Sequence, residues 1–290
     1  MNSVIATIIT YNPNLKRLEK NILSIVNQVE EVLILDNKSS NIASIKKLIS
    51  VINKENNKNI GIIENDSNRG IAYALNQSIN YAYSNNYHWT LTLDQDSICD
   101  EDMIKYMELY LETNDKENIG IIAPSIIDEN KQNEIEKMSG DIEFPTVVIT
   151  SGSLTNTKIA KKIGGFVNEL FIDYVDHEFC LRLRKNKYNI VKLKKAKLYH
   201  ELGEIKTYNL FGKTATTTNH SDLRRYYYYR NSIYVHKTYK KEFPEWVKLD
   251  RGRQIRAFIG ILMFEKNKLN KVSKSIKGLR DGFKGRYGEF

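Results

Sequence analysis

The N-terminal part of the chain alternates short apolar runs with segments of helical periodicity, and this alternation constrains the fold more than any other feature of the sequence. The apolar runs are rich in β-branched side chains, as is typical of strands buried on both faces of a sheet. They cover Val4–Thr10 and residues 31–35, 60–64 and 91–93. Apolar residues recur at helical spacing between them, over residues 15–26, 42–52 and 71–83. Connections of this length join parallel strands, so the pattern predicts an α/β fold with a Rossmann-like, mostly parallel central sheet flanked by helices.

Each predicted strand ends in polar residues. In chain order these are Thr10, Tyr11 and Asn12, then Asp36, then Asn68 and Arg69, and finally Asp94, Gln95 and Asp96. Ligands of doubly wound sheets bind at the carboxyl ends of the strands, so these residues predict a nucleotide pocket. The first strand is not followed by G-x-G-x-x-G and the sequence has no P-loop, which disfavours dinucleotide redox chemistry and ATPase activity.

Asp94 and Asp96 stand one residue apart at the end of the last of these strands. Two carboxylates in this arrangement suit a hard divalent cation such as Mg²⁺ or Mn²⁺, which prefers oxygen ligands and can also bind substrate phosphates. The alternative is that the two acids cap the helix predicted near Glu101, because Asp is a common turn and N-cap residue.

Composition narrows the cellular setting. Cys99 and Cys180 lack metal-ligand spacing and are typical of free thiols in a reducing cytoplasm. Residues 1–10 show no signal-peptide pattern, and the longest apolar run, residues 257–264, is far shorter than a membrane span.

The net charge of +9 requires an anionic partner or a generic basic surface. Basic residues concentrate near the end of the chain, beside the apolar run, and this favours an anionic membrane surface over nucleic acid. They are Lys266, Lys268, Lys271, Lys274, Lys277, Arg280 and Lys284. Trp246 and residues 255–264 are typical of amphipathic helices at a membrane or a homodimer interface, so we expect a C-terminal helical extension.

Several short motifs together resemble a known family. The series ITYNP, LILDNKSS, NRGIAYALNQSI and TLDQDS resembles the nucleotide-binding half of family 2 glycosyltransferases of the GT-A fold. Residues 151–153, 164–166, 171–184 and 200–203 are similar to the acceptor side of that family. Residues 220–227, Arg230 with Asn231, and residues 278–286 resemble its bacterial rhamnosyltransferase branch.

The resemblance implies an organisation and an activity. Residues 1–96 would form the nucleotide-sugar-binding half of the GT-A domain, residues 97–215 its acceptor-binding and catalytic half, and residues 216–290 a basic and aromatic helical extension. The implied enzyme is an inverting, metal-dependent glycosyltransferase with dTDP-L-rhamnose as donor, and UDP-hexoses are the alternative donors. A lipid-linked glycan on the cytoplasmic leaflet would be the acceptor, in cell-wall, capsule or O-antigen assembly at the inner face of the plasma membrane.

The same resemblance assigns nucleotide-sugar binding to residues at the strand ends. They are Thr10, Tyr11, Asn12, Asp36, Asn68, Arg69, Asp94, Gln95 and Ser153. Asp36 could accept the imide N–H of uracil or thymine, or it could cap the next helix. Arg69 could clamp a diphosphate received at the N-terminus of the following helix, or it could be an exposed cation.

Asp176 is implied to be the catalytic base. The family usually has a Glu-Asp pair at this point, and Val175 takes the place of the Glu. A positioned carboxylate suits the chemistry, because a sugar hydroxyl loses its proton as it attacks the anomeric carbon. For Asp173 and Glu178 we expect helix N-terminal charge or surface solvation.

His200 and an Arg- and Tyr-rich segment complete the candidate site. His200 closes a predicted strand and is either a third metal ligand, a diphosphate contact or a structural His. Arg224, Arg225, Tyr227 and Arg230 suit a sugar face or a lipid diphosphate, and the alternative is a helix with a tyrosine core face. No RNP-like strand accompanies them, so nucleic acid is disfavoured as a partner.

Two other classes of function compete with transfer of a sugar. A sugar nucleotidyltransferase would share the α/β domain and the acidic site, but it would carry a Gly-rich loop with Lys or Arg after the first strand, and ITYNPN has neither. A binding module without catalysis would tolerate the loss of Asp96 and Asp176.

Overall fold

The computed structural model describes residues 3–129, 134–135, 140–200, 206–210, 213–217 and 219–290. Four parallel strands form one side of the central sheet, in the order β3-β2-β1-β4. They are β1 (Val4–Thr10), β2 (Glu31–Asp36), β3 (Gly61–Glu64) and β4 (Trp89–Asp94), and they are connected by the helices α1 (Leu15–Ile25), α2 (Ile42–Asn56) and α3 (Ile71–Ser84). The α/β prediction and the alternation on which it rests are confirmed.

The sheet continues through the predicted boundary at residue 96, in the order β4-β9-β6-β10-β5. Strand β9 runs antiparallel to both of its neighbours, whereas β6 and β10 pair in parallel. These strands are β5 (Ile98–Cys99), β6 (Ile119–Asp128), β9 (Ser153–Asn156) and β10 (Asn189–His200), with short additions at β7 (Glu134–Ile135) and β8 (Ile142–Glu143). The helical segments are α4 (Met103–Thr113), η1 (Lys116–Asn118), α5 (Thr157–Lys162), η3 (Asn168–Leu170) and α6 (Val175–Lys185).

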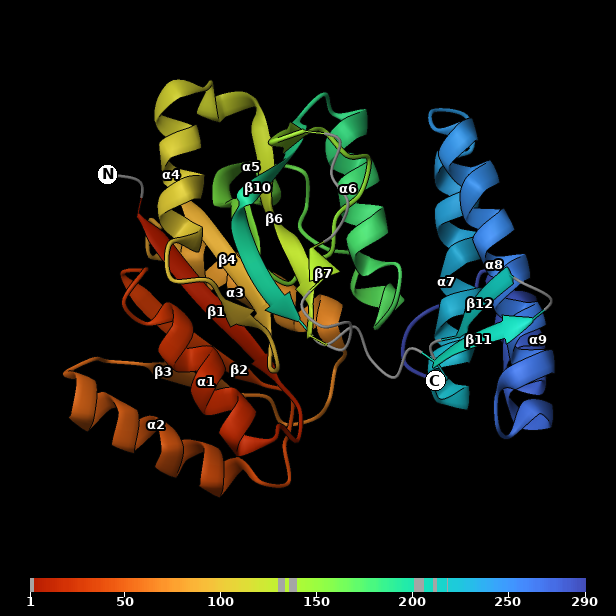
Figure 1. The fold of residues 1–290 in the computed structure, drawn as a ribbon, viewed down its shortest axis with the longest axis horizontal. Helices are drawn as coiled ribbons and strands as arrows, with labels where there is room; N and C mark the ends of the chain where they lie inside the picture. Colours follow the sequence, from red (N-terminus) through yellow and green to blue (C-terminus); the bar gives the residue numbers. More distant parts are fainter. Residues whose placement is uncertain (1–2, 130–133, 136–139, 201–205, 211–212, 218) are drawn as a thin grey trace.

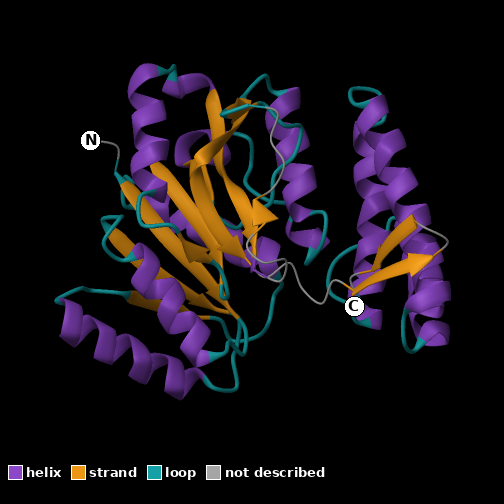
Figure 2. Ribbon diagram, viewed as in Figure 1, coloured by secondary structure: helices purple, strands orange, loops and turns teal. Residues whose placement is uncertain are grey.

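Helices cover both faces of the sheet (Figures 1 and 2). Side chains alternate between the faces along β1, because successive residues of a strand point in opposite directions. Val4, Ala6 and Ile8 pack in the cluster that includes α1, α2 and α4, and Ile5 and Ile9 pack in the one that includes α3, α5 and α6. This double burial explains the continuous apolar runs in the sequence.

The predicted C-terminal helical extension is confirmed as α7 (Asp222–Tyr239), α8 (Pro244–Phe264) and α9 (Lys268–Phe283). A two-stranded ribbon of β11 (Lys206–Leu210) and β12 (Lys213–Thr217) precedes α7 (Figure 1). Helices α7 and α9 lie so close that a Cβ atom on Gly278 would stand 2.3 Å from the carbonyl oxygen of Tyr226. Among the described residues, none of the helices combines the length and apolar character needed to cross a bilayer.

Candidate functional site

Two acids and a histidine converge at one edge of the sheet. Asp94 is the last residue of β4, Asp96 follows in the next turn, and His200 is the last residue of β10. One ligand atom from each of the three lies within 4.8 Å of the others. His200 Nδ1 stands 3.8 Å from Asp96 Oδ1, and the Asp96 side chain is 40 % exposed. The structure therefore brings together the three residues that the sequence analysis named as metal ligands, and a cation could reach them.

Two serines fix the turn that carries the acids. The Asp94 N–H donates to Ser151 Oγ (2.9 Å), and Ser97 Oγ lies 2.7 Å from Ser151 Oγ and 2.9 Å from His200 Nδ1. These contacts set the backbone of Asp94 and the ring of His200. Neither serine is among the site residues predicted from the sequence, although Ser97 follows Asp96 directly and Ser151 lies in a segment that resembles the acceptor side of the family.

The electrostatics of the cluster favour a bound cation. Burial raises the pKa of Asp94, the carboxylates of Asp96 and Asp176 raise it further, and His200 and Arg224 oppose the rise. Neighbouring carboxylates that repel one another are stabilised as anions by a divalent ion. Two carboxylates and an imidazole match the ligand preferences of Mn²⁺, and the carboxylates match those of Mg²⁺. The residues present thus fit such an ion.

Asp176 lies in the first turn of α6. Its Oδ1 accepts hydrogen bonds from the backbone N–H of His177 (2.8 Å) and contacts His177 Nδ1 (2.8 Å). Burial opposes the charge of Asp176, but the interactions with His177 outweigh burial and lower the pKa of the carboxyl group. Asp176 is therefore an ionised carboxylate at neutral pH, and it acts electrostatically on Asp94 across the site.

The two other acids of this segment have internal partners. Arg224 Nε donates to both carboxylate oxygens of Asp173, at 3.1 and 3.3 Å. Glu178 accepts hydrogen bonds from Arg182 (2.7 Å) and from the Tyr239 hydroxyl (2.8 Å). Because the side chains of Asp173 and Glu178 are only 11 % and 3 % exposed, the expectation of surface solvation is wrong for both. Glu178 lies in the first turn of α6, which agrees with the other expectation, a helix N-terminal charge.

The predicted base contact, Asp36, is occupied within the chain. The residue is 1 % exposed, and its carboxylate accepts hydrogen bonds from Thr10 Oγ1 (2.8 Å), the Ser39 N–H (2.7 Å) and the Ser39 hydroxyl. Asp36 thus closes the turn after β2. Beside it, the Tyr11 N–H donates to Gln95 Oε1 (2.8 Å), which ties the end of β1 to the acidic turn. The Asn12 side chain accepts from the Ser40 N–H (2.7 Å).

Polar groups of the loop before α3 have partners within the chain. Asn68 Oδ1 accepts the Gly70 N–H (3.0 Å), and the Arg69 guanidinium lies 3.7 Å from the centre of the Tyr73 ring. The Ile71 N–H, at the start of the helix, donates to the carbonyl of Phe171 (2.7 Å). The Ile71 N–H is therefore not available to the diphosphate that was predicted to bind at this helix terminus.

Ser153 pairs with Thr92 of β4, two residues before Asp94. It is 2 % exposed, and its hydroxyl donates to the carbonyl of Ile149 (2.6 Å). Residues 201–203 of the predicted acceptor motif lie outside the described residues.

Of the four residues that were predicted to contact the acceptor or the diphosphate, one lies at the site and three lie in the core. Arg224 reaches Asp173 and is 44 % exposed. Arg225 is paired with Glu265, and Tyr227 stacks on Phe171. Arg230 donates to the carbonyls of residues 169 and 170. Side chains buried with internal partners have no surface for a ligand, so the structure corrects the prediction for three residues: Arg225, Tyr227 and Arg230. They match the alternative, a helix with a tyrosine core face.

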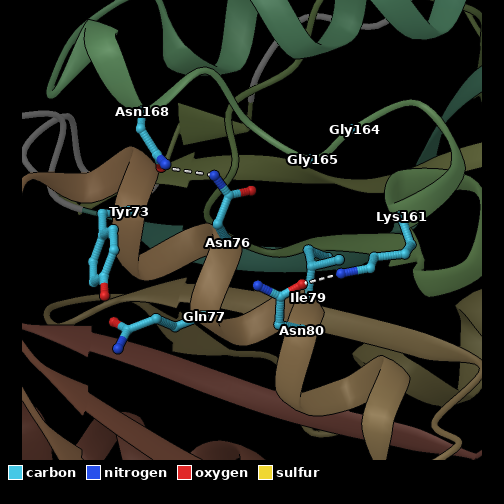
Figure 3. A pocket seen from close by; sticks show the side chains of 9 residues that line it. All are labelled: Tyr73, Asn76, Gln77, Ile79, Asn80, Lys161, Gly164, Gly165 and Asn168. Carbon is cyan, nitrogen blue, oxygen red and sulfur yellow. Dashed lines mark hydrogen bonds between the residues drawn. The ribbon is translucent and has the colours of Figure 1, made fainter. Parts of the chain in front are cut away.

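A separate cavity of about 480 Å³ lies between α3 and the segment around α5 (Figure 3). Several of its polar side chains form hydrogen bonds with one another. Lys161 Nζ donates to Asn80 Oδ1 (2.6 Å), and Asn76 Nδ2 donates to Asn168 Oδ1 (2.7 Å). The lining residues are Tyr73, Asn76, Gln77, Ile79, Asn80, Lys161, Gly164, Gly165 and Asn168. The cavity shares no residue with the acidic cluster.

A family model and a characterised relative both relate this chain to glycosyltransferases. Residues 5–186 match the family described as Glycosyl transferase family 2. The chain is 30 % identical to the dTDP-rhamnosyl transferase RfbF of Shigella flexneri over 304 aligned residues, which cover 98 % of this chain and 97 % of that protein.

Solved glycosyltransferases share the fold at low sequence identity. GalNAc-T7 with UDP, GalNAc and Mn²⁺ has a TM-score of 0.62 and 13 % identity over 98 % of this chain, which spans 56 % of that one. The mannosyltransferase PcManGT of Pyrobaculum calidifontis, in complex with GDP-Man and Mn²⁺, has a TM-score of 0.60 and 11 % identity. The similarity covers 99 % of this chain and 76 % of the mannosyltransferase chain. These likenesses support the predicted GT-A fold.

Proposed function

Since the chain belongs to glycosyl transferase family 2 and is a glycosyltransferase, we propose that it transfers L-rhamnose from dTDP-L-rhamnose with inversion at the anomeric carbon. The similarity to a dTDP-rhamnosyl transferase along nearly the whole of both chains carries this choice of donor. Family membership also disfavours the nucleotidyltransferase alternative. UDP-hexoses remain the competing donors.

Asp94, Asp96 and His200 would hold the Mg²⁺ or Mn²⁺ ion in this proposal. Their ligand atoms are close enough to share one ion, and the raised pKa of Asp94, which burial causes, shows that anionic charge is unfavourable there without a counterion. When bound, the ion supplies positive charge to the diphosphate that leaves the sugar. Ser97 and Ser151 keep His200 and the turn of Asp94 in place.

Asp176 acts as the base in the proposed reaction. The acceptor hydroxyl forms a bond to the anomeric carbon while the bond from that carbon to the diphosphate oxygen breaks, and the hydroxyl proton passes to the Asp176 carboxylate. The low pKa that His177 imposes keeps Asp176 ionised and ready to accept the proton. Arg224, exposed and paired with Asp173, contributes positive charge beside the site.

A donor panel with an Asp176→Asn variant tests this function. The substitution keeps the shape of the side chain and removes its basicity, so we expect transfer to fall by about 10²- to 10⁴-fold while dTDP binding is retained. Nucleotide release would be measured with dTDP-rhamnose, UDP-glucose, UDP-galactose and UDP-N-acetylglucosamine and a lipid-linked acceptor mimic. Near-normal turnover of the variant would refute the role of Asp176, and a preference for a UDP-sugar would refute the donor.

We further propose that α8 places the enzyme on an anionic membrane, where a lipid-linked acceptor would be found. Ile255, Ile259 and Leu262 are three or four residues apart on one face of the helix, and they are between 47 % and 62 % exposed. Arg251 and Arg256 are exposed on the same helix. An apolar stripe flanked by cations suits anionic lipid better than a neutral protein partner.

Sedimentation with vesicles tests the membrane proposal. We expect the wild-type chain to sediment with vesicles that contain phosphatidylserine and an Ile255→Glu/Ile259→Glu variant to remain in solution. Equal sedimentation of the two proteins would contradict the proposal. A change in oligomeric state instead of vesicle binding would identify the stripe as a homodimer interface.

A further inference from the structure

The loop that leads into α6 has an unfavourable backbone. Phe171, Asp173 and Tyr174 have φ angles of +63°, +63° and +64°, in the left-handed region that non-glycine residues rarely occupy. Phe171 combines its positive φ with a ψ of −67°, which is the rare classic γ-turn conformation. Such a backbone persists only where its surroundings hold it in place.

Asn231 of α7 supplies much of this support. Its Nδ2 atom lies within hydrogen-bonding distance of the carbonyl oxygens of Leu170 (2.7 Å), Ile172 (2.8 Å) and Asp173 (2.9 Å). Asn231 is fully buried. One amide group therefore contacts three carbonyls of the strained loop, where water cannot replace it.

Arg230 extends this support toward η3. Its Nη2 atom donates to the carbonyls of Glu169 (2.9 Å) and Leu170 (3.2 Å), and its Nε atom donates to Asn231 Oδ1 (2.9 Å). The guanidinium is 4.7 Å from the centre of the Tyr227 ring. Two adjacent residues of α7 thus bind the carbonyls of residues 169, 170, 172 and 173.

The same loop connects the parts of the candidate site. Tyr174 is the N-cap of α6, two residues before Asp176, and Asp173 holds Arg224. On its other side, the Phe171 carbonyl accepts the Ile71 N–H of α3. Gly70 is needed for this approach, because its φ is +81° and a Cβ atom there would stand 2.6 Å from the Phe171 oxygen.

We propose that Arg230 and Asn231 are positioning residues for the transfer reaction. By holding residues 169–173 in the strained conformation, they set the location of Asp176 relative to the Asp94–Asp96–His200 cluster. The inference rests on the proposed role of Asp176 as the base. A displacement of about 1 Å at a reacting group is enough to cost about 100-fold in rate.

An Asn231→Ala variant tests the inference, with Asn53→Ala as the matched control. Asn53 is also a helical asparagine that holds a loop backbone, through Ile60 N (2.8 Å) and Ile60 O (3.3 Å), but it lies in α2. For Asn231→Ala we expect kcat to fall by about 10- to 100-fold. The Kd for dTDP with Mn²⁺, measured by calorimetry, should change by less than about threefold, because the acidic cluster is held by other residues.

The control separates positioning from stability. Asn53→Ala should lower the melting temperature while kcat stays within about twofold of wild type. The inference is overturned if Asn231→Ala keeps its kcat, or if the two variants lose kcat in proportion to their loss of stability. If Asn231→Ala does not fold, Arg230→Lys takes its place, since it keeps the cation but loses the planar fork, and unchanged kcat in that variant would equally overturn the inference.

The Asp176→Asn variant distinguishes this inference from the proposed function. Loss of transfer in Asp176→Asn together with normal kcat in Asn231→Ala would refute only the positioning role. Retained transfer in Asp176→Asn would refute the base assignment, and the positioning role would fall with it.

Discussion

The acidic cluster at the sheet edge and the polar network inside the C-terminal helices use similar residues for opposite purposes. At the sheet edge, the Asp96 side chain is 40 % exposed and its Oδ1 atom lies 3.8 Å from His200 Nδ1. In the helices, Asp250 is buried and bonds to the Tyr174 hydroxyl (2.7 Å) and to His236 Nε2 (2.8 Å). The first arrangement leaves charge to be neutralised by a ligand, and the second neutralises it within the chain.

A second buried group makes the same contrast. Glu265 accepts from Arg225 and from Lys271 Nζ (2.8 Å), and its side chain has no exposed surface. Buried charges of this kind are tolerated only when they are paired and hydrogen-bonded. The contrast teaches that the acids and the histidine of the Asp94–Asp96–His200 cluster are available for chemistry, whereas the charged groups inside the helical extension stabilise the fold.

The largest effect should come from removing a charge at the sheet edge. We expect Asp96→Ala to lower transfer by about 10³-fold or more, because the positive charge opposite the leaving group is lost. Its free energy of unfolding without metal should stay within about 0.5 kcal/mol of wild type or increase, since Asp96 raises the pKa of Asp94. Initial rates with and without EDTA, and urea denaturation, measure both effects.

Glu112→Ala, which removes an exposed carboxylate on α4, is the control for that variant. It should leave transfer and stability unchanged. Full activity of wild-type protein in EDTA would show that the cluster does not need a metal ion. The contrast between a charge neutralised by a ligand and one neutralised within the chain would then not hold.

Removing a charge in the helices should reverse the pattern. We expect Arg225→Met to destabilise the fold by about 3–5 kcal/mol, because Glu265 loses one of its buried partners. Arg224→Met, one residue away, removes a half-exposed side chain, and its partner Asp173, whose pKa burial raises, can become neutral by taking up a proton. This variant should therefore lose less free energy of unfolding than Arg225→Met while it lowers transfer. Equal losses of stability in the two variants would break the comparison.

The smallest effect should appear in acid. Burial opposes the charge of Asp250, but the hydrogen bonds from His236 and Tyr174 outweigh it and lower the pKa of the carboxyl group. A lowered folded-state pKa means that this stabilisation is complete above the ordinary pKa of about 3.9 and is lost as the pH falls through the folded value. An Asp250→Asn variant should therefore have a lower melting temperature than wild type near neutral pH. Between about pH 5 and pH 2, its melting temperature should fall by less than that of wild type. Parallel curves for variant and wild type would contradict this.

Much of the architecture follows from local sequence signals. The β-branched runs and the helical segments between them predicted the order of strands and helices, and polar residues at strand ends predicted the cluster of Asp94, Asp96 and His200. The resemblance to family 2 glycosyltransferases implied a second half at residues 97–215, but the antiparallel pairing of β9 within it was not predicted. All of these predictions depend on patterns that span a few residues or on motifs that occur in order.

The roles of Arg224, Arg225 and Arg230 could not be predicted in this way. Tyrosines occupy four consecutive positions of α7, residues 226–229, so the helix has no apolar stripe that would reveal which face is buried. The partners of these arginines, Asp173, Glu265 and the carbonyl of Leu170, are distant in sequence. Nor does any local signal predict that the Phe171 carbonyl caps α3, because that bond depends on the tertiary fold.

The antiparallel strand β9 also determines when the site can form. It lies between β4 and β6, and its approach brings Ser151 to the backbone of Asp94 across 57 residues of sequence. His200 arrives still later, at the end of β10. Both carboxylates are thus synthesised long before their histidine, and closing such distant contacts is slow. During synthesis the chain therefore carries an incomplete acidic turn, and the Asp94–Asp96–His200 cluster is complete only when β10 has joined the sheet.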